Sequence, residues 1–188
     1  MFVNPTDEQR DVYSAVYEAH EHALSQLVAG AKLSAVYNST KAKLEGSKYP
    51  FLAGKVGKSM GFAMGIDFRE SSLLISPKTE ETARKGMVFN INIGCSDLTN
   101  RDTKDAKNKK YAISIADTVL VNDGEPATIL TAGKKRAKNI SIFLKDDSSS
   151  DDEVEDNNDN SNKILGRGMR NTSLASSKRD HDTSENKR

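Results

Sequence analysis

The 188-residue chain contains no tryptophan, only one cysteine and three histidines, and no long apolar run. The single cysteine, Cys95, excludes both an internal disulfide and a zinc site built from several cysteines. The apolar runs are far shorter than the ~18 residues that cross a bilayer, so the sequence predicts no membrane span. No basic and apolar leader follows Met1, and no signal peptide is predicted. These absences together favour a reducing compartment.

A net charge of +1 hides a strong separation of charge along the chain. Residues 1–145 carry 21 Lys and Arg against 16 Asp and Glu, a net charge of +5. Residues 146–159 carry eight acidic and no basic side chains, whereas residues 163–188 carry seven basic and three acidic ones. Both segments have too few apolar side chains to offset the entropy lost on ordering. We therefore expect residues 146–188 to be disordered and the folded part to end near residue 145.

Two helices are predicted in the first 45 residues. Thr6 and Gln9 match a capping box, and apolar residues at helical spacing follow as far as Val28. Gly30 is expected to end this helix as its C′ glycine. A second helix is predicted over residues 34–44, and the glycine-rich stretch of residues 46–66 predicts loops.

The pattern then changes to that of β-strands. Residues 87–95 and 111–121 alternate apolar with small or polar side chains, and residues 100–110 are a predicted loop between them. Shorter strands are predicted over residues 127–131 and 139–144, with a turn at residues 122–124. Two helices followed by antiparallel strands indicate the α+β class.

Residue spacing alone reveals no catalytic constellation. His20 and His22 lie two apart in a helix, so they point to different faces and do not bind one metal together. His181 falls in the basic tail, and no histidine lies near Cys95 in the sequence to activate it as a nucleophile. The glycines at 54, 57, 61 and 65 match neither the Walker pattern nor the dinucleotide fingerprint.

Four motifs nevertheless carry a family resemblance: GFAMGIDFRE (61–70), GMVFNINIG (86–94), SIADTVLV (114–121) and EPATILT (125–131). Their order resembles the creatinase/methionine aminopeptidase superfamily, which implies a pita-bread fold and, in active members, a dinuclear metal site. By this resemblance Phe62 stands at the metal-binding His, Asn92 and Ala116 at two metal-binding Glu residues, and Arg69 at a substrate-facing His. Phe and Ala have no donor atom and Asn offers a neutral carbonyl, so we expect no metal, no cofactor and no peptidase activity.

Within this superfamily, KKRAKNISIFL (134–144) and ILGRG (164–168) after an acidic run resemble the large subunit of the FACT histone chaperone. The resemblance implies that residues 1–145 are the C-terminal part of a non-catalytic aminopeptidase-like domain. Residues 146–162 would then be an acidic linker, and residues 163–188 a basic segment leading to a dimerisation domain that this chain lacks. It also implies histone binding and nucleosome reorganisation during transcription elongation, DNA replication and repair, in the nucleus and on chromosomes. The implied partners are core histones, nucleosomes and the small HMG-box subunit of FACT, with no membrane and little or no direct DNA contact.

Three surfaces are candidates for binding. One is a peptide groove at Arg69 and Asn92, and another is a basic cluster, residues 134–138, which is also interpretable as a solvated hairpin tip. The third is the acidic run, which is equally interpretable as a solubilising linker; its candidate histone-binding residues are Asp146, Asp147, Asp151, Asp152, Glu153, Glu155 and Asp156. Residues 148–150 are three serines that match an acidophilic kinase site. The alternative functions are a metal-dependent aminopeptidase or prolidase, and a ribosome-associated pseudo-peptidase.

Overall fold

The computed structural model describes residues 2–101, 103–104, 107, 109–131 and 133–144. The predicted acidic linker and basic segment, residues 146–188, lie outside the described residues, as do the acidic candidates, the three serines and His181. The elements in chain order are β1 (Phe2–Val3), α1 (Asp7–Gln26), α2 (Leu33–Glu45), a 3₁₀ turn η1 (Pro50–Gly54), β2 (Gly61–Met64), β3 (Glu70–Leu74), β4 (Val88–Thr99), β5 (Lys110–Leu120), β6 (Thr128–Ile129), α3 (Ala137–Ile140) and β7 (Ser141–Ile142).

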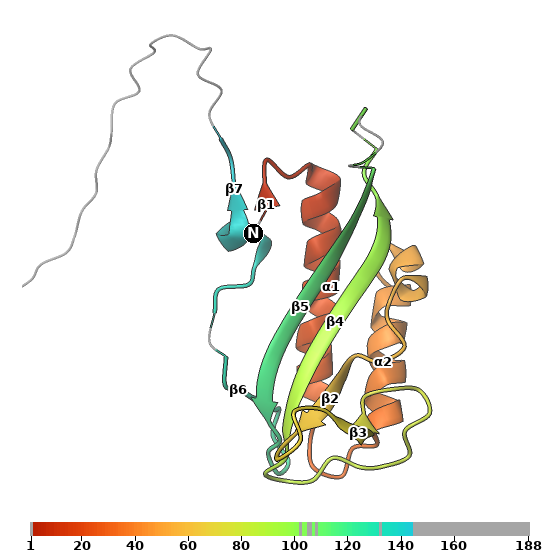
Figure 1. The fold of residues 1–188 in the computed structure, drawn as a ribbon, viewed down its shortest axis with the longest axis vertical. Helices are drawn as coiled ribbons and strands as arrows, with labels where there is room; N and C mark the ends of the chain where they lie inside the picture. Colours follow the sequence, from red (N-terminus) through yellow and green to blue (C-terminus); the bar gives the residue numbers. More distant parts are fainter. Residues whose placement is uncertain (1, 102, 105–106, 108, 132, 145–188) are drawn as a thin grey trace, which may run out of the picture. The chain divides into compact units, whose positions relative to one another are not determined.

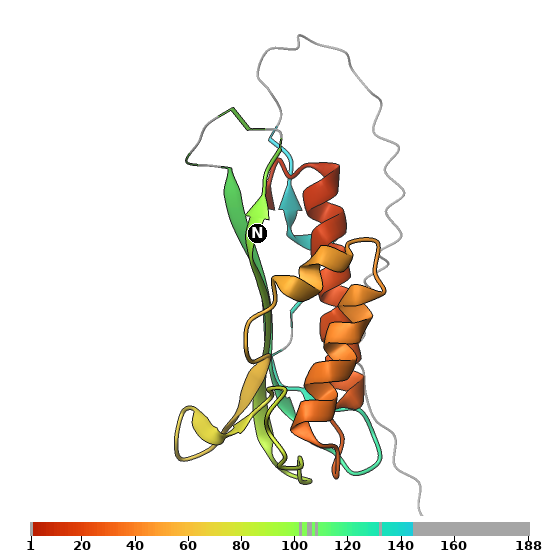
Figure 2. The ribbon, with the colours of Figure 1, turned by 90° about the vertical axis from the view of Figure 1, so that its right-hand side faces the viewer.

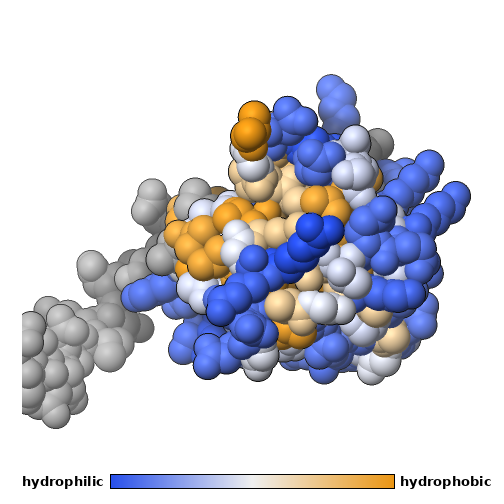
Figure 3. Space-filling view, turned by 90° about the horizontal axis from the view of Figure 1, so that it is seen from below, coloured by the Kyte–Doolittle hydropathy of each residue, from blue (hydrophilic) through white to orange (hydrophobic). Residues whose placement is uncertain are grey.

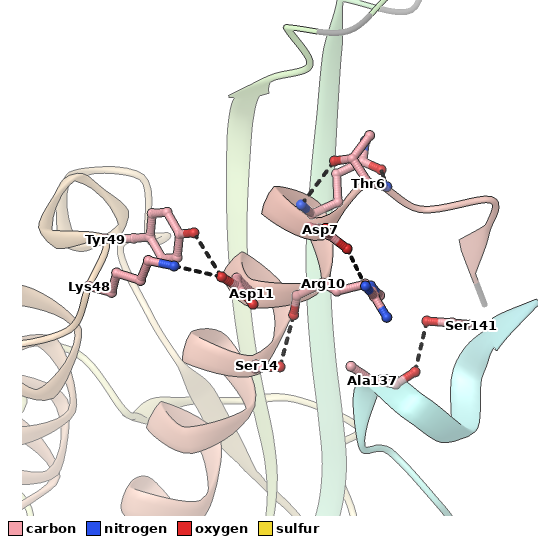
Figure 4. Close-up of polar contacts among 10 residues, drawn as sticks. Thr6, Asp7, Arg10, Asp11, Ser14, Lys48, Tyr49, Ala137 and Ser141 are labelled. Carbon is pink, nitrogen blue, oxygen red and sulfur yellow. Dashed lines mark hydrogen bonds and ion pairs between the residues drawn. The ribbon is translucent and has the colours of Figure 1, made fainter.

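The predicted capping box begins α1 as expected. The backbone N–H of Gln9 donates to Thr6 Oγ1 at 3.2 Å, and Gln9 Oε1 accepts from the backbone N–H of Thr6 at 3.1 Å (Figure 4). The prediction that Gly30 ends the helix is wrong, because the helix already ends at Gln26 with Leu27 as its cap. Gly30 has a φ of +85° and serves the following turn, where its N–H donates to the Ala83 carbonyl at 2.8 Å.

Helix α2 is close to its predicted bounds and packs beside α1 (Figure 1). Asp11 of α1 accepts hydrogen bonds from Lys48 Nζ at 2.8 Å and from the Tyr49 hydroxyl at 3.3 Å (Figure 4). These bonds, above all the one from Lys48, lower the pKa of the Asp11 carboxyl. They join α1 to the segment that follows α2.

The main sheet has the order β3-β2-β4-β5-β6 and is antiparallel throughout. The two long predicted strands are confirmed as β4 and β5. The loop predicted between them lies partly outside the described residues, and Lys110, its expected last residue, already belongs to β5. β4 runs four residues beyond its predicted end, past a bulge between Cys95 and Leu98 in which Asp97 has a φ of +55°.

Two expectations for the shorter elements are wrong, and one strand was not predicted. β2 lies inside the stretch expected to be loops, and β3, which pairs with β2 as a short hairpin, was not predicted, because both strands have few residues and β2 depends on pairing with the distant β4. Residues 139–144 are not one strand: the short helix α3 extends to Ile140, and β7 then pairs in parallel with β1. Such short apolar segments do not distinguish helix from strand by period.

The alternation along β4 and β5 builds a core on one face of the sheet. Their buried apolar side chains pack with those of α1 and α2, and both helices lie on that face (Figure 2). The opposite face of these two strands carries small or polar side chains: Asn90, Asn92, Gly94, Ala112, Ser114 and Ala116. No helix in the described part of the chain lies over this second face (Figures 1 and 2), and the α+β class is confirmed.

Within the described ranges, no helix combines the length and the apolar character that crossing a membrane requires.

Candidate functional site

The positions expected for metal ligands meet on the face of the sheet that the helices leave uncovered. Asn92 of β4 lies opposite Ala116 of β5, and Phe62 of β2 pairs with Asn90, two residues before Asn92. Phe62, Arg69 and Asn92 line one groove with a volume of about 380 Å³, whose floor includes Gly94 and Ser114. Ala116 faces Asn92 across the strand pair but does not line this groove, which we call the outer groove.

The side chains of the outer groove contact one another. The Arg69 guanidinium carbon lies 5.2 Å from the centre of the Phe62 ring, and the rings of Phe62 and Phe68 lie 5.7 Å apart. The Ser114 hydroxyl donates to Asn92 Oδ1 at 2.7 Å. Among the described residues that line the outer groove, Arg69 is the only charged one.

These residues do not fit the dinuclear metal centre of the superfamily's active members. Phe62 and Ala116 have no donor atom, and the one oxygen of Asn92 is neutral and already accepts a hydrogen bond. Throughout the described part of the chain, no group of three or more His, Cys, Asp or Glu side chains is placed to hold a metal ion. The outer groove offers instead amides, hydroxyls, an aromatic face and one guanidinium.

Cys95 borders the outer groove, but its thiol is buried. Burial raises the pKa of Cys95 to about 11, and its nearest polar partner is the Leu52 carbonyl, 3.9 Å from Sγ. Because the thiolate is the reactive form, Cys95 is inert near neutral pH. Its geometry is that of a small core residue.

A buried polar cluster on the helical side of the sheet was not predicted. His20 of α1, expected to be an ordinary helix residue, is 0% exposed, and its Nε2 lies 3.4 Å from Oδ2 of the buried Asp117 on β5. Asp117 Oδ1 accepts from Lys135 Nζ and from the Thr131 hydroxyl, both at 2.6 Å. Burial lowers the pKa of His20, although Asp117 opposes this shift. We call these four residues the His20 cluster.

The interpretation of residues 134–138 as a hairpin tip is wrong, although Lys134, Arg136 and Lys138 are exposed, as a solvated cluster requires. Lys135 points inward to Asp117, and β6 and β7, the strands on either side, belong to different sheets. The one sequence feature that could have revealed this is Asp117 itself. It stands at a core-facing position of a strand whose other core-facing side chains are apolar, and a buried carboxylate requires a partner.

Comparisons with known proteins agree with this geometry. Residues 1–123 match the metallopeptidase family M24. The chain belongs to metallopeptidase family M24. Among M24-type structures, the N-terminal domain of FACT complex subunit SPT16 from Cicer arietinum superposes with a TM-score of 0.69 at 31% identity, covering 74% of this chain and 32% of that chain. The X-Pro aminopeptidase of Thermotoga maritima, with a TM-score of 0.60 at 24% identity over 76% of this chain and 34% of that chain, shows the shared fold.

The curated relatives narrow the resemblance within family M24. The FACT complex subunit spt-16 of Caenorhabditis elegans is 38% identical over 187 residues, which is 98% of this chain and 18% of that protein. The resemblance to the large FACT subunit and the partial pita-bread fold are thus confirmed. The chain spans about a fifth of the length of this relative.

Proposed function

We propose that this M24 chain is a non-catalytic, histone-binding part of a FACT-type histone chaperone. The observation that carries the proposal is 38% identity to a FACT subunit along 98% of the chain. The residues at the three expected metal-ligand positions, Phe62, Asn92 and Ala116, support the proposal, because they lack the carboxylates and imidazole that a metallopeptidase needs. The partners would be core histones, nucleosomes and the small HMG-box subunit, in the nucleus and on chromosomes. The work of the complex would be nucleosome reorganisation during transcription elongation, replication and repair.

Capture of core histones by the full 188-residue chain tests this proposal. Purified core histones are expected to bind in near-physiological salt, whereas purified ribosomes are not. Retention of ribosomes without histones would favour the ribosome-associated pseudo-peptidase and overturn the chaperone assignment. Naked DNA is included because we expect direct DNA contact to be weak or absent.

Hydrolysis of X-Pro dipeptides with added Mn²⁺, Co²⁺ or Zn²⁺ separates the chaperone from the peptidase. No turnover above a heat-denatured control is expected, because two of the three ligand positions have no donor atom. Turnover that rises with protein concentration, together with a stoichiometric tightly bound metal, would show that the chain is an enzyme.

The outer groove is the proposed site for an extended, largely uncharged stretch of histone. The outer surface of β4 and β5 presents small side chains, and Asn92 and Ser114 provide amide and hydroxyl groups for a peptide backbone. Arg69→Gln combined with Asn92→Ala is expected to weaken binding of tiled histone peptides roughly fivefold to tenfold, about 1 kcal/mol. Arg101→Gln, at an exposed arginine outside the groove, is the matched control. Unchanged peptide affinity in the double variant would remove the outer groove from the proposal.

The acidic run is the second proposed contributor. Its eight acidic side chains would attract basic histone surfaces over roughly a Debye length of ~8 Å. Changing all eight to Asn or Gln is expected to flatten the dependence of histone affinity on salt. An unchanged salt dependence would leave these residues as a linker. Phosphorylation at residues 148–150 would add negative charge, and phosphopeptide mass spectrometry from dividing cells would detect it.

A further inference from the structure

The β2–β3 hairpin separates two grooves of different charge. One is the outer groove, with Arg69. The other has a volume of about 530 Å³, and we call it the hairpin groove; its lining residues are Ala63, Met64, Gly65, Ile66, Asp67, Glu70, Leu73 and Met87. It therefore combines two carboxylates with several apolar side chains, and no lysine, arginine or histidine is among its described lining.

The separation of charge follows from the course of the chain between β2 and β3. Arg69 is the last residue before β3 and Glu70 is its first residue, and the two side chains border different grooves. Arg69 turns to the outer groove and stacks on Phe62, whereas Glu70 and Asp67 border the hairpin groove. A basic segment is therefore repelled on one side of the hairpin and attracted on the other.

Neither carboxylate of the hairpin groove has a cationic partner among the described residues. Glu70 Oε1 accepts from the Ser72 hydroxyl at 2.8 Å, which leaves its negative charge in place. No ion pair joins Asp67 to a lysine, arginine or histidine in the described part of the chain. Two uncompensated negative charges thus lie beside apolar surface.

The apolar part of the hairpin groove is also accessible. Ile66 is fully exposed, Phe68 beside it is 75% exposed, and Met64, Leu73 and Met87 are half-buried. The end of the molecule that carries β2 and β3 shows patches of hydrophobic surface among hydrophilic side chains (Figure 3). Exposed apolar surface with a polar rim marks interaction sites, and methionine side chains adapt to varied partners.

We propose that the hairpin groove docks a basic amphipathic segment of a partner protein, with two or more Lys or Arg side chains flanking an apolar one. The apolar side chain would lie against Ile66, Leu73 and Met87, and the cations would pair with Asp67 and Glu70. Nucleic acid does not fit, because the two carboxylates repel phosphate. Identifying the partner as a core histone rests on the proposed function; the chemistry of the groove does not.

Fluorescence anisotropy with the full 188-residue chain tests the hairpin groove. The probe is a labelled twelve-residue peptide of alternating Lys and Leu, with Lys→Gln and Leu→Ser versions as negative probes. Asp67→Asn combined with Glu70→Gln is expected to weaken binding of the Lys/Leu peptide about tenfold, since two partly exposed ion pairs are lost. Glu81→Gln combined with Glu125→Gln, which removes two exposed carboxylates outside the hairpin groove, is the matched control and is expected to leave the affinity unchanged.

The measurement is repeated on a chain whose acidic run is neutralised, so that the acids of residues 146–159 do not mask the hairpin groove. Circular dichroism and the urea midpoint check that each variant folds. Equal affinity of the parent chain and the Asp67/Glu70 double variant, or equal losses in that variant and in the Glu81/Glu125 control, would overturn the proposal. So would a parent chain that sediments as a dimer and becomes monomeric in Ile66→Ser, because the occupant would then be a second copy.

The failure of this inference and that of the proposed function are distinguishable. The Lys/Leu peptide contains no histone sequence, so its binding reports the hairpin groove alone. Intact core histones that bind the Asp67/Glu70 double variant as well as the parent chain would keep the proposed function but overturn the hairpin groove as its histone site.

Discussion

Replacing His20 by glutamine should remove a defined part of the dependence of stability on pH. His20 is enclosed by α1 and β5, and the charged groups that act on it are Asp117, Glu21 and Lys135. Desolvation lowers its pKa, with a smaller contribution from the positive charge of Lys135, while Asp117 and Glu21 act in the opposite direction. The imidazole is therefore neutral in the folded chain at pH 7.

The sign of the effect follows from proton binding. Between the unfolded pKa of about 6.5 and the lower folded pKa, the unfolded chain binds more protons than the folded one, so stability falls as the pH falls. If the folded imidazole stays neutral throughout, the loss between pH 7 and pH 5.5 is about 1.2 kcal/mol. Above about pH 8 His20 contributes almost no slope, and below its folded pKa the loss reaches a constant value.

Urea denaturation at half-unit pH steps from 7.5 to 5.0 measures this contribution. His20→Gln does not titrate, so the difference in unfolding free energy between parent and variant should change by about 2 kcal/mol over this range if the folded imidazole stays neutral, whatever the variant's absolute stability. Gln26→Ala, at an exposed position at the end of the same helix, is the non-titrating control and should leave the slope unchanged. An identical slope in the parent and His20→Gln would refute the buried, neutral assignment of His20.

Lys135, the cation of the His20 cluster, provides a second test of this pH dependence. Lys135→Met removes a positive charge that lowers the pKa of His20, leaving Asp117 to raise it. The loss of stability below pH 7 should then be smaller in Lys135→Met than in the parent chain. A steeper loss in this variant would contradict the contacts described for Asp117.

Three further changes follow from single contacts. Gly61→Ala should lower the unfolding free energy by about 2–4 kcal/mol in urea denaturation, because a Cβ would lie 2.3 Å from the Asn90 carbonyl oxygen at a φ of +154°. Gly65→Ala, with open space around Gly65, should change the unfolding free energy little. Cys95 should resist iodoacetamide at pH 8 by mass spectrometry and react only in urea, and fast labelling of the native chain would contradict its burial. Thr6→Ala should cost about 1 kcal/mol by loss of the cap, and Thr6→Ser should restore most of it.

Local features of the fold were predictable from the sequence. The capping box at Thr6 needs only four residues. The alternation of apolar with small or polar side chains along β4 and β5 indicates which face of each strand is buried. β2 was missed because its glycine-rich sequence resembles a loop, and the requirement for Gly61 arises from the approach of β4, which is distant in sequence. The ion pair between Asp117 and Lys135 was not predictable, because it depends on the path of the chain between the two residues.

The outer groove was predictable only in part. The absence of donor atoms at Phe62 and Ala116 can be read from the residues once the family resemblance is known. The hairpin groove was not predictable, because its lining comes from β2, β3, the connection between them and the residue before β4, and their arrangement follows from pairing between short strands. Neither groove could be assigned its charge without knowing that β3 begins at Glu70, directly after Arg69.

The pairing of β1 with β7 sets an order of events for newly made chains. Phe2 lies beside Ser141, and the Asn4 N–H donates to the Ile142 carbonyl at 2.8 Å (Figure 1). Synthesis at ~5–20 residues per second separates these partners by roughly ten seconds or more. During that interval the ribosome has released α1 and α2, but β7, the strand that pairs with β1, has not yet been made. A chain that stops before Ser141 would keep that strand unpaired permanently, and a chaperone or protease could recognise it.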